Sequence, residues 1–214
     1  QVDPAHCRAL AEAQYHCCQC NPRAYVLWFE PQFNHYLNAY AAQTLRPLAE
    51  QLIEVCERQF GPDQPDTAKA LTNLARVAHM QGAVDRAEPL LRRAIAIQEQ
   101  ALHADHPDMA LTIAALGAYC SGRGDLRAAE PFFRRALDIR ERVLGAEHPQ
   151  TLGTLDNLAK ALVELGRLDE AETLFRRVLA THERTAGPQH SDTAFALTAL
   201  GEVLAKKGEH AAAE

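Results

Sequence analysis

The chain has 214 residues, of which 47% are apolar and 23% are charged, a composition typical of a globular protein and too apolar for a disordered chain. Its 22 Lys and Arg against 28 Asp and Glu give a formal charge of -6. This balance argues against nucleic acid as the main partner, because a protein that binds the phosphate backbone needs a basic surface. No apolar run approaches the roughly 20 residues that a membrane helix needs, so we expect no membrane partner either.

The first part of the chain carries most of the cysteines. Four of the six fall within the first 20 residues, and their spacing matches no common zinc site, in which ligands usually come as pairs roughly two to four residues apart. We therefore expect reduced thiols in a cytoplasmic protein and no bound metal or other cofactor. A metal site is the alternative, and its residues would be His6, Cys7, His16, Cys17, Cys18 and Cys20.

A helix is expected at 42–60. When this segment is aligned with the one 42 residues later, Pro47 matches Pro89. The helix before it lacks the glycine that ends the corresponding helices later in the chain, because Tyr40 stands in that place. Terminal repeats are often atypical, since they cap an open end. We therefore predict that 1–64 forms a divergent N-terminal cap that ends in a degenerate repeat.

From residue 65 onward the sequence repeats with a period of 42 residues. Glycines recur at positions 82, 124, 166 and 208, and a histidine in the turn between units recurs at 106, 148 and 190. A fixed period of this length is the signature of a repeat architecture. The predicted units are repeats at 65–106, 107–148 and 149–190 and a truncated partial repeat at 191–214. The last unit should hold a first helix and the beginning of a second, and we expect the chain to be a piece of a longer protein.

Each unit is predicted to form two helices. In the first unit, apolar residues from Leu71 to Ala78 follow the i, i+3, i+4, i+7 spacing of a buried helical face, which predicts a first helix over 66–81. Gly82 supplies a left-handed C-cap, and the second helix starts near Asp85. Stacked helix pairs of this kind predict an all-α fold, an α-solenoid. The large side chains expected to fill the space between units are Leu91, Phe133 and Phe175.

Charged residues recur on the second helix of each unit. Glu88, Glu130 and Glu172 each precede an arginine by four residues, a spacing that places the two side chains side by side on a helix. An arginine ladder that binds an anion is the alternative interpretation. We favour surface ion pairs, because they need nothing beyond the helix itself.

A binding groove is expected on the first helices, which line the concave side of such a superhelix. The positions left over from packing predict a peptide-binding groove made of Lys69, Thr72, Asn73, Arg76, Ala115, Ala118, Asn157, Lys160 and Glu164. In the last unit the equivalent positions are Phe195, Thr198, Ala199, Glu202, Ala205 and Lys206.

The chemistry of these positions suits an extended peptide. An asparagine carries both a donor and an acceptor, so Asn73 and Asn157 can hold a peptide backbone of any sequence. Small residues in the middle unit leave room for a ligand side chain. Lys69, Arg76 and Lys160 add positive charge, which favours a partner segment with an acidic residue and an apolar or aromatic anchor.

Four strings characterise the repeat: Leu-Thr-Asn-Leu-Ala at 71–75, Leu-Asp-Asn-Leu-Ala at 155–159, Ala-Glu-Pro-Leu-Leu-Arg-Arg-Ala at 87–94 and Gly-Ala-Glu-His-Pro at 145–149. They resemble the tetratricopeptide repeat in the longer form of the kinesin light chains and of many bacterial scaffold proteins. The resemblance covers 61–214 and implies a right-handed superhelix. In that family, asparagines at the matching place bind cargo peptides, a role that the resemblance extends to Asn73 and Asn157, whereas Ala115 and Ala199 depart from the pattern.

No catalytic motif is recognisable in the sequence: it has no phosphate-binding glycine loop, no nucleophile elbow and no HExxH. The sequence therefore predicts a protein-protein interaction scaffold without enzymatic activity, whose partner is a protein or peptide. One alternative is a sensor or regulatory arm of a larger multidomain enzyme, such as a signalling ATPase or protease, in which the convex face or the aromatic-rich N-terminal cap makes the main contact. Another is self-association through the exposed ends of the array.

Overall fold

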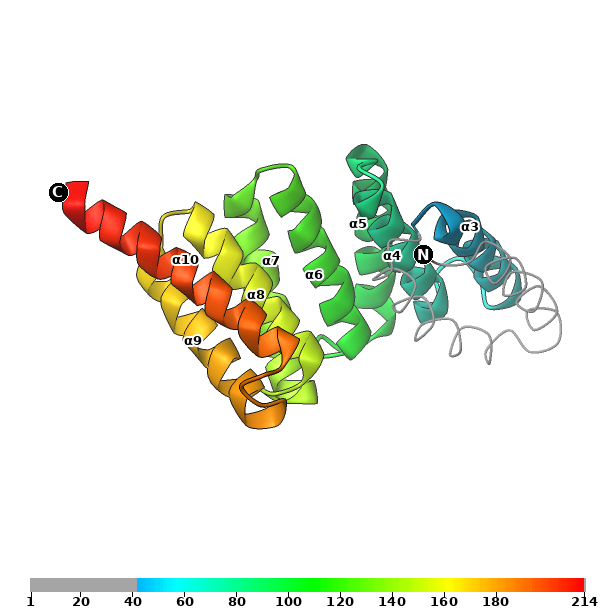
Figure 1. Ribbon diagram of the computed structural model, residues 1–214. Helices are drawn as coiled ribbons and strands as arrows, with labels where there is room; N and C mark the ends of the chain where they lie inside the picture. Colours follow the sequence, from blue (N-terminus) through cyan, green and yellow to red (C-terminus); the bar gives the residue numbers. More distant parts are fainter. Residues whose placement is uncertain (1–41, 214) are drawn as a thin grey trace. The chain divides into compact units, whose positions relative to one another are not determined.

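The computed structural model describes residues 42–213, all of whose regular elements are helices (Figure 1). They form two compact units, with the division between residues 104 and 105. The first unit contains α3 (Ala42–Gln59), α4 (Pro65–Met80) and α5 (Val84–Ala101). The second contains α6 (Pro107–Gly122), α7 (Leu126–Leu144), α8 (Pro149–Glu164), α9 (Leu168–Thr185) and α10 (Ser191–Ala213).

Within each compact unit, every helix packs against the next one along the chain (Figure 1). In the second compact unit α6 also contacts α8, so the first helices of successive pairs are neighbours. Helix pairs that stack in series in this way confirm the predicted all-α solenoid.

Glycines end the first helix of each complete pair, as predicted. Gly82, Gly124 and Gly166 have φ angles of 71°, 79° and 77°, in the left-handed region that a side chain resists. The last repeat differs from the prediction, because α10 continues through Gly208 to Ala213 without a turn. A glycine permits the left-handed conformation but does not impose it, and within the described residues no further helix packs back on α10.

The large side chains expected between repeats are in the interior. Leu91, Phe133 and Phe175 are all buried. Phe133 of α7 packs in one cluster with Leu158 and Leu162 of α8, and Phe175 of α9 packs with Leu200 and Val203 of α10. In the second compact unit, each helix pair therefore contacts the next helix through a large apolar side chain, whose burial stabilises the fold by roughly 1.5–3 kcal/mol.

The exposed apolar face predicted for α10 is only partly present. The sequence predicts an exposed apolar face made by Leu197, Leu200 and Leu204. Leu197 and Leu204 are exposed, but Leu200 is buried in the cluster around Phe175. The prediction is wrong for Leu200 because its side chain lies on the α10 face that packs against the preceding pair.

A threonine hydroxyl donates to a glycine carbonyl across the turn between consecutive repeats, a hydrogen bond that we call the clasp. Thr151 donates its hydroxyl to the Gly145 carbonyl over 2.8 Å, and Thr193 and Thr67 make the same bond to Gly187 and Gly61. At the division between the two compact units, the positions equivalent to Gly61 and Thr67 hold His103 and Met109. The glycine and the threonine that form the clasp are therefore both absent from the sequence between the two compact units.

Replacing Thr151 with valine should lower the free energy of unfolding of the chain by about 1 kcal/mol, because valine keeps the shape but leaves the Gly145 carbonyl without this donor. The measurement is the midpoint of urea unfolding. Thr173→Val is the matched control, since the Thr173 hydroxyl donates to the Asp169 carbonyl within its own helix. Equal losses in the two variants would contradict a role of the clasp between repeats.

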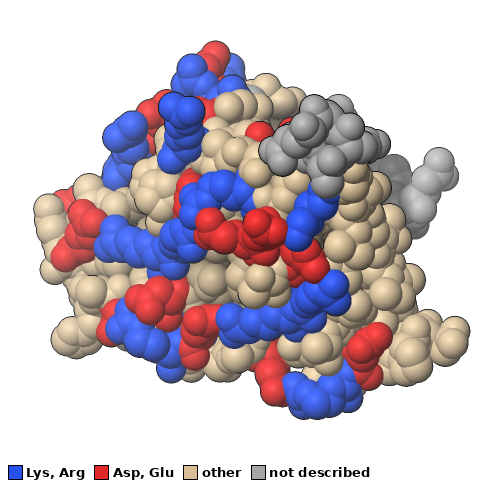
Figure 2. All heavy atoms as spheres, turned by 90° about the vertical axis from the view of Figure 1, so that its left-hand side faces the viewer, with Lys and Arg blue, Asp and Glu red and all other residues tan. Residues whose placement is uncertain are grey.

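The predicted ion pairs form on the second helices. Arg92, Arg134 and Arg176 each contact the glutamate four residues earlier, at 2.7 to 2.8 Å. Arg134 also reaches Glu170, and Arg167 reaches both Glu130 and Glu170, so four charges join α7 and α9. On the face shown in Figure 2, basic and acidic side chains alternate and neither sign forms a broad patch. These arginines support the surface of the fold, as the spacing predicts.

The pKa of Glu130 links this network to acid stability. Burial favours the protonated acid, but hydrogen bonds from Arg134 and Arg167 outweigh it and hold the pKa of Glu130 below its ordinary value. Its stabilising contribution is therefore complete above the ordinary carboxyl pKa and is lost as the pH falls through the lower, folded-state value.

Glu130→Gln should consequently reduce the dependence of stability on pH in the acid range. We expect the gap in urea midpoint between wild type and this variant to be open at pH 7 and to close as the pH falls below about 4. Glu183→Gln, a change at an exposed site on α9, is the control. A gap that stays constant down to pH 3 would show that the Glu130 ion pairs do not stabilise the fold.

A candidate peptide groove between α8 and α10

The groove residues predicted in the first repeat are less accessible than their register suggests. Thr72 and Asn73 of α4 are 0% and 1% exposed, in contrast to the open position that the repeat predicts. The Thr72 hydroxyl donates to the Ala68 carbonyl over 3.0 Å, and the Asn73 amide oxygen accepts from Arg76 over 3.4 Å. Lys69 is partly buried on the same helix. The interactions of Thr72 and Asn73 thus lie partly within α4 itself.

In the second compact unit, the predicted residues fall into two groups. Ala115 and Ala118 of α6 are partly buried, and Ala118 packs against the cluster around Phe133. Asn157, Lys160 and Glu164 are exposed along α8. Lys160 and Glu164 lie beside α10, where the structure forms two adjoining pockets.

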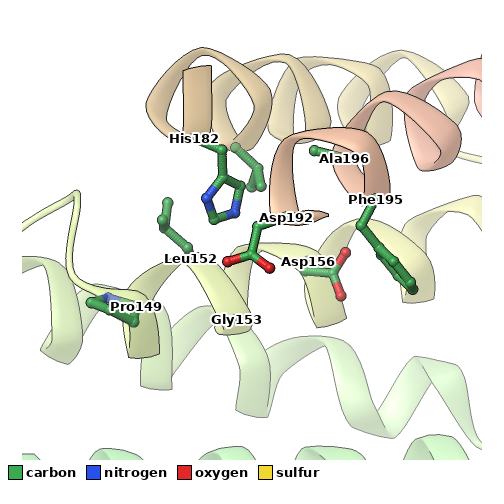
Figure 3. Close-up of a pocket in the computed structure, with 9 residues that line it drawn as sticks. Pro149, Leu152, Gly153, Asp156, His182, Asp192, Phe195 and Ala196 are labelled. Atoms are coloured by element: carbon green, nitrogen blue, oxygen red, sulfur yellow. The ribbon is translucent and has the colours of Figure 1, made fainter. Parts of the chain in front are cut away.

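The larger pocket has a volume of about 250 Å³ and is formed by α8, α9 and α10 (Figure 3). Its lining consists of Pro149, Leu152, Gly153, Asp156, Val178, His182, Asp192, Phe195 and Ala196. Figure 3 shows the carboxylates of Asp156 and Asp192 extending into the pocket from two different helices, with the Phe195 ring beside Asp156. Phe195 is 69% exposed, an unusual position for an aromatic side chain in a well-packed array. We call this site the α8–α10 pocket.

The smaller pocket, of about 120 Å³, lies further along the same two helices. It is lined by Lys160, Val163, Glu164, Phe175, Ala199, Glu202, Val203 and Lys206. Phe175 and Val203 are buried and form an apolar floor, whereas the charged residues form the rim. Lys206 contacts Glu164 at 3.2 Å.

Lys160 stands between the two pockets. Its ammonium group donates to an Asp156 carboxylate oxygen over 2.6 Å and lies 5.7 Å from the centre of the Phe195 ring. Both contacts are favourable for a cation, one by charge and one by the negative face of the ring. Lys160 and Lys206, the lysines that line the smaller pocket, therefore each carry a carboxylate partner from the chain itself.

The repeat register identifies part of this site from the sequence. Lys160 and Phe195 occupy predicted groove positions of their repeats, and the structure brings them together. His182 and Asp192 were missed, because they belong to the second helix of a pair and to the first turn of α10. The sequence does offer one signal for Asp192 as a site residue. It lies in the first turn of a first helix, next to the groove positions of the first helix in the preceding pair.

The metal alternative falls outside the described residues, since all its cysteines and histidines precede residue 42. Within 42–213, no group of His, Cys, Asp or Glu side chains is arranged to hold a metal ion. None of the helices in that range has the length and apolar character needed to cross a membrane. Of the cysteines in that range, Cys56 is buried and Cys120 is partly buried.

Comparison with known proteins supports a repeat architecture over most of the chain. A family model described as the tetratricopeptide repeat matches residues 42–100, 81–142, 108–180 and 150–214. A search of curated proteins finds no match.

Solved structures share the fold. A crystal structure of the nearly identical TPR-like repeats of a putative kinesin light chain from Podosopora anserina aligns with a TM-score of 0.68 at 23% identity, covering 84% of this chain and 85% of that one. A variant of the same protein with one substitution aligns with a TM-score of 0.69, also at 23% identity, covering 84% of each chain. BtubC (BKLC) from P. vanneervenii aligns with a TM-score of 0.62 at 20% identity, covering 78% of this chain and 67% of that one. At these identities the likeness concerns the fold.

Proposed function

Because the chain belongs to the tetratricopeptide repeat family, whose repeats mediate protein-protein interactions, we propose that it is a non-enzymatic scaffold that binds an extended segment of a partner protein between α8 and α10. Repeat arrays of this kind present continuous surfaces made by the first helices of successive units. An extended peptide laid along such a surface can place alternate side chains into neighbouring pockets.

The two adjoining pockets between α8 and α10 carry this proposal. Exposed positions that the repeat register assigns to the groove line both of them, and an apolar floor lies beside charged rims. The exposed side chain of Asn157, on the same helix, offers a donor and an acceptor for a peptide backbone. Sites of this composition bind through the apolar parts of a ligand and orient it through a few polar groups.

The first repeat supports the proposal less than the site between α8 and α10 does. Lys69, Thr72, Asn73 and Arg76 remain predicted groove residues. An acidic partner residue was also predicted, and near Lys160 it would have to compete with the carboxylate that Lys160 already contacts. The proposal therefore specifies an extended segment and does not use an acidic preference at this site.

Filling the larger pocket tests the proposed function. Gly153 lines this pocket, and a Cβ atom added there meets no atom within 4 Å, so we expect Gly153→Phe to place its ring in the pocket. Binders selected from a random linear peptide library against the 214-residue chain should lose about tenfold or more in affinity for this variant, which corresponds to about 1.4 kcal/mol. Fluorescence anisotropy with labelled peptides measures the change.

Gly201→Phe is the matched control, since Gly201 lies on α10 outside both pockets and a Cβ atom there also meets nothing within 4 Å. Its peptide affinities should equal those of wild type. Selected peptides that bind Gly153→Phe as well as wild type, or a library that yields no binder, would overturn the proposed function.

A further inference from the structure

We propose that the α8–α10 pocket is a subsite for a cationic side chain, specifically an arginine of the bound segment. The inference rests on the proposed function for the claim that this arginine belongs to a partner protein. It runs against the acidic preference that the sequence predicts, and it follows from the charges that line the pocket.

The lining of the pocket is negative at its centre. Asp156 and Asp192 extend into it from α8 and α10 (Figure 3), and none of the nine lining residues is a Lys or Arg. Among the described residues, Asp192 is exposed, and its carboxylate makes polar contacts with His190 at 3.6 Å and Ser191 at 3.4 Å. An incoming cation therefore finds a carboxylate that no Lys or Arg neutralises.

Phe195 supplies the second element of the site. Its exposed ring stands beside Asp156 at the wall of the pocket (Figure 3). A guanidinium group can stack on an aromatic face and at the same time donate in its own plane to carboxylates. The pocket volume of about 250 Å³ is below the roughly 300 Å³ at which small-molecule sites begin, so it suits a single side chain.

Lys160 is a cation that already lies at this wall of the pocket. Its ammonium group contacts both Asp156 and the face of Phe195, the same two groups that the proposed arginine would use. Lys160 therefore competes with the ligand. Removing its charge should strengthen the binding of a cationic ligand, whereas an acidic ligand would bind more weakly to the same variant.

The test is an NMR titration of the full 214-residue chain at low salt with Nα-acetyl-arginine methylamide. We expect saturable shifts at the amides of Gly153, Asp192 and Ala196. The matched probe is the citrulline analogue, which has a similar shape and no charge and should bind about fivefold more weakly. Equal binding of the two probes, or shifts that miss these amides, would overturn the proposal.

Variants separate the contributions of the lining groups. Asp192→Asn should weaken binding of the arginine probe about threefold, and Phe195→Ala by a similar factor, while Leu197→Ala, at an exposed site of α10 outside both pockets, should change nothing. Lys160→Met should strengthen it about threefold, because it frees Asp156 and Phe195. Weaker binding of the arginine probe to Lys160→Met would contradict the assignment.

The outcomes distinguish this inference from the proposed function. Selected peptides that lose affinity for Gly153→Phe, combined with no response to the arginine probe, would overturn the subsite and leave the proposed function standing. Binding of the arginine probe without any selected peptide would support the cation pocket and contradict the proposed function.

Discussion

Phe133→Ala should lower the free energy of unfolding by about 3–5 kcal/mol, the usual loss for truncating a buried phenylalanine. Phe133 is 2% exposed and lies in a cluster that joins α7 to Leu158 and Leu162 of α8. Truncation leaves a cavity at the contact between two helix pairs, and neither pair can close it without shifting against the other. The result is measured by urea unfolding, followed by circular dichroism at 222 nm.

Two further variants make this result specific. Phe133→Leu introduces the residue that the first repeat has at the equivalent position, Leu91, so it should cost less than half as much as alanine. Val143→Ala on the same helix removes an exposed side chain and should change the stability by no more than about 0.5 kcal/mol. A loss below about 1 kcal/mol in Phe133→Ala would contradict the view that single large residues hold successive pairs together.

The parts of the fold that depend on local spacing could be predicted from the sequence. The 42-residue period places Gly82 at the end of a helix, and it places Phe133 and Phe175 between repeats. These positions follow from the pattern of residues within each repeat. In the same way, the register identifies Lys160 and Phe195 as groove residues. Their common position in each repeat determines the direction in which the side chain leaves the helix.

The parts that depend on what surrounds a side chain could not be predicted. Register gives the direction of the Thr72 and Asn73 side chains but not what covers them, and both are buried. The charge of this part of the groove was predicted from Lys160 alone, whereas its effect depends on the contact with Asp156. Asp192 completes the α8–α10 pocket from the first turn of the next repeat, which the comparison of equivalent positions does not include.

Gly117→Ala should destabilise the chain by about 1–3 kcal/mol, the range for overpacking a tight interior, even though alanine is the better helix former by about 1 kcal/mol. Gly117 is buried in α6, and a Cβ atom there would come within 2.9 Å of two ring atoms of Phe133. The absence of a side chain therefore permits the close contact of α6 with α7.

The coupling between these two residues makes the prediction decisive. If the loss comes from the Phe133 ring, Gly117→Ala should cost much less in a Phe133→Leu background, where the smaller side chain leaves room for the methyl group. A double-mutant cycle measured by urea unfolding should then give a coupling energy of about 1 kcal/mol. Gly201→Ala provides the comparison, because a Cβ atom at that helical glycine meets nothing within 4 Å and should stabilise the chain through helix propensity alone. Additive losses in the cycle would show that the two residues do not constrain each other, and the close approach of α6 and α7 would then need another cause.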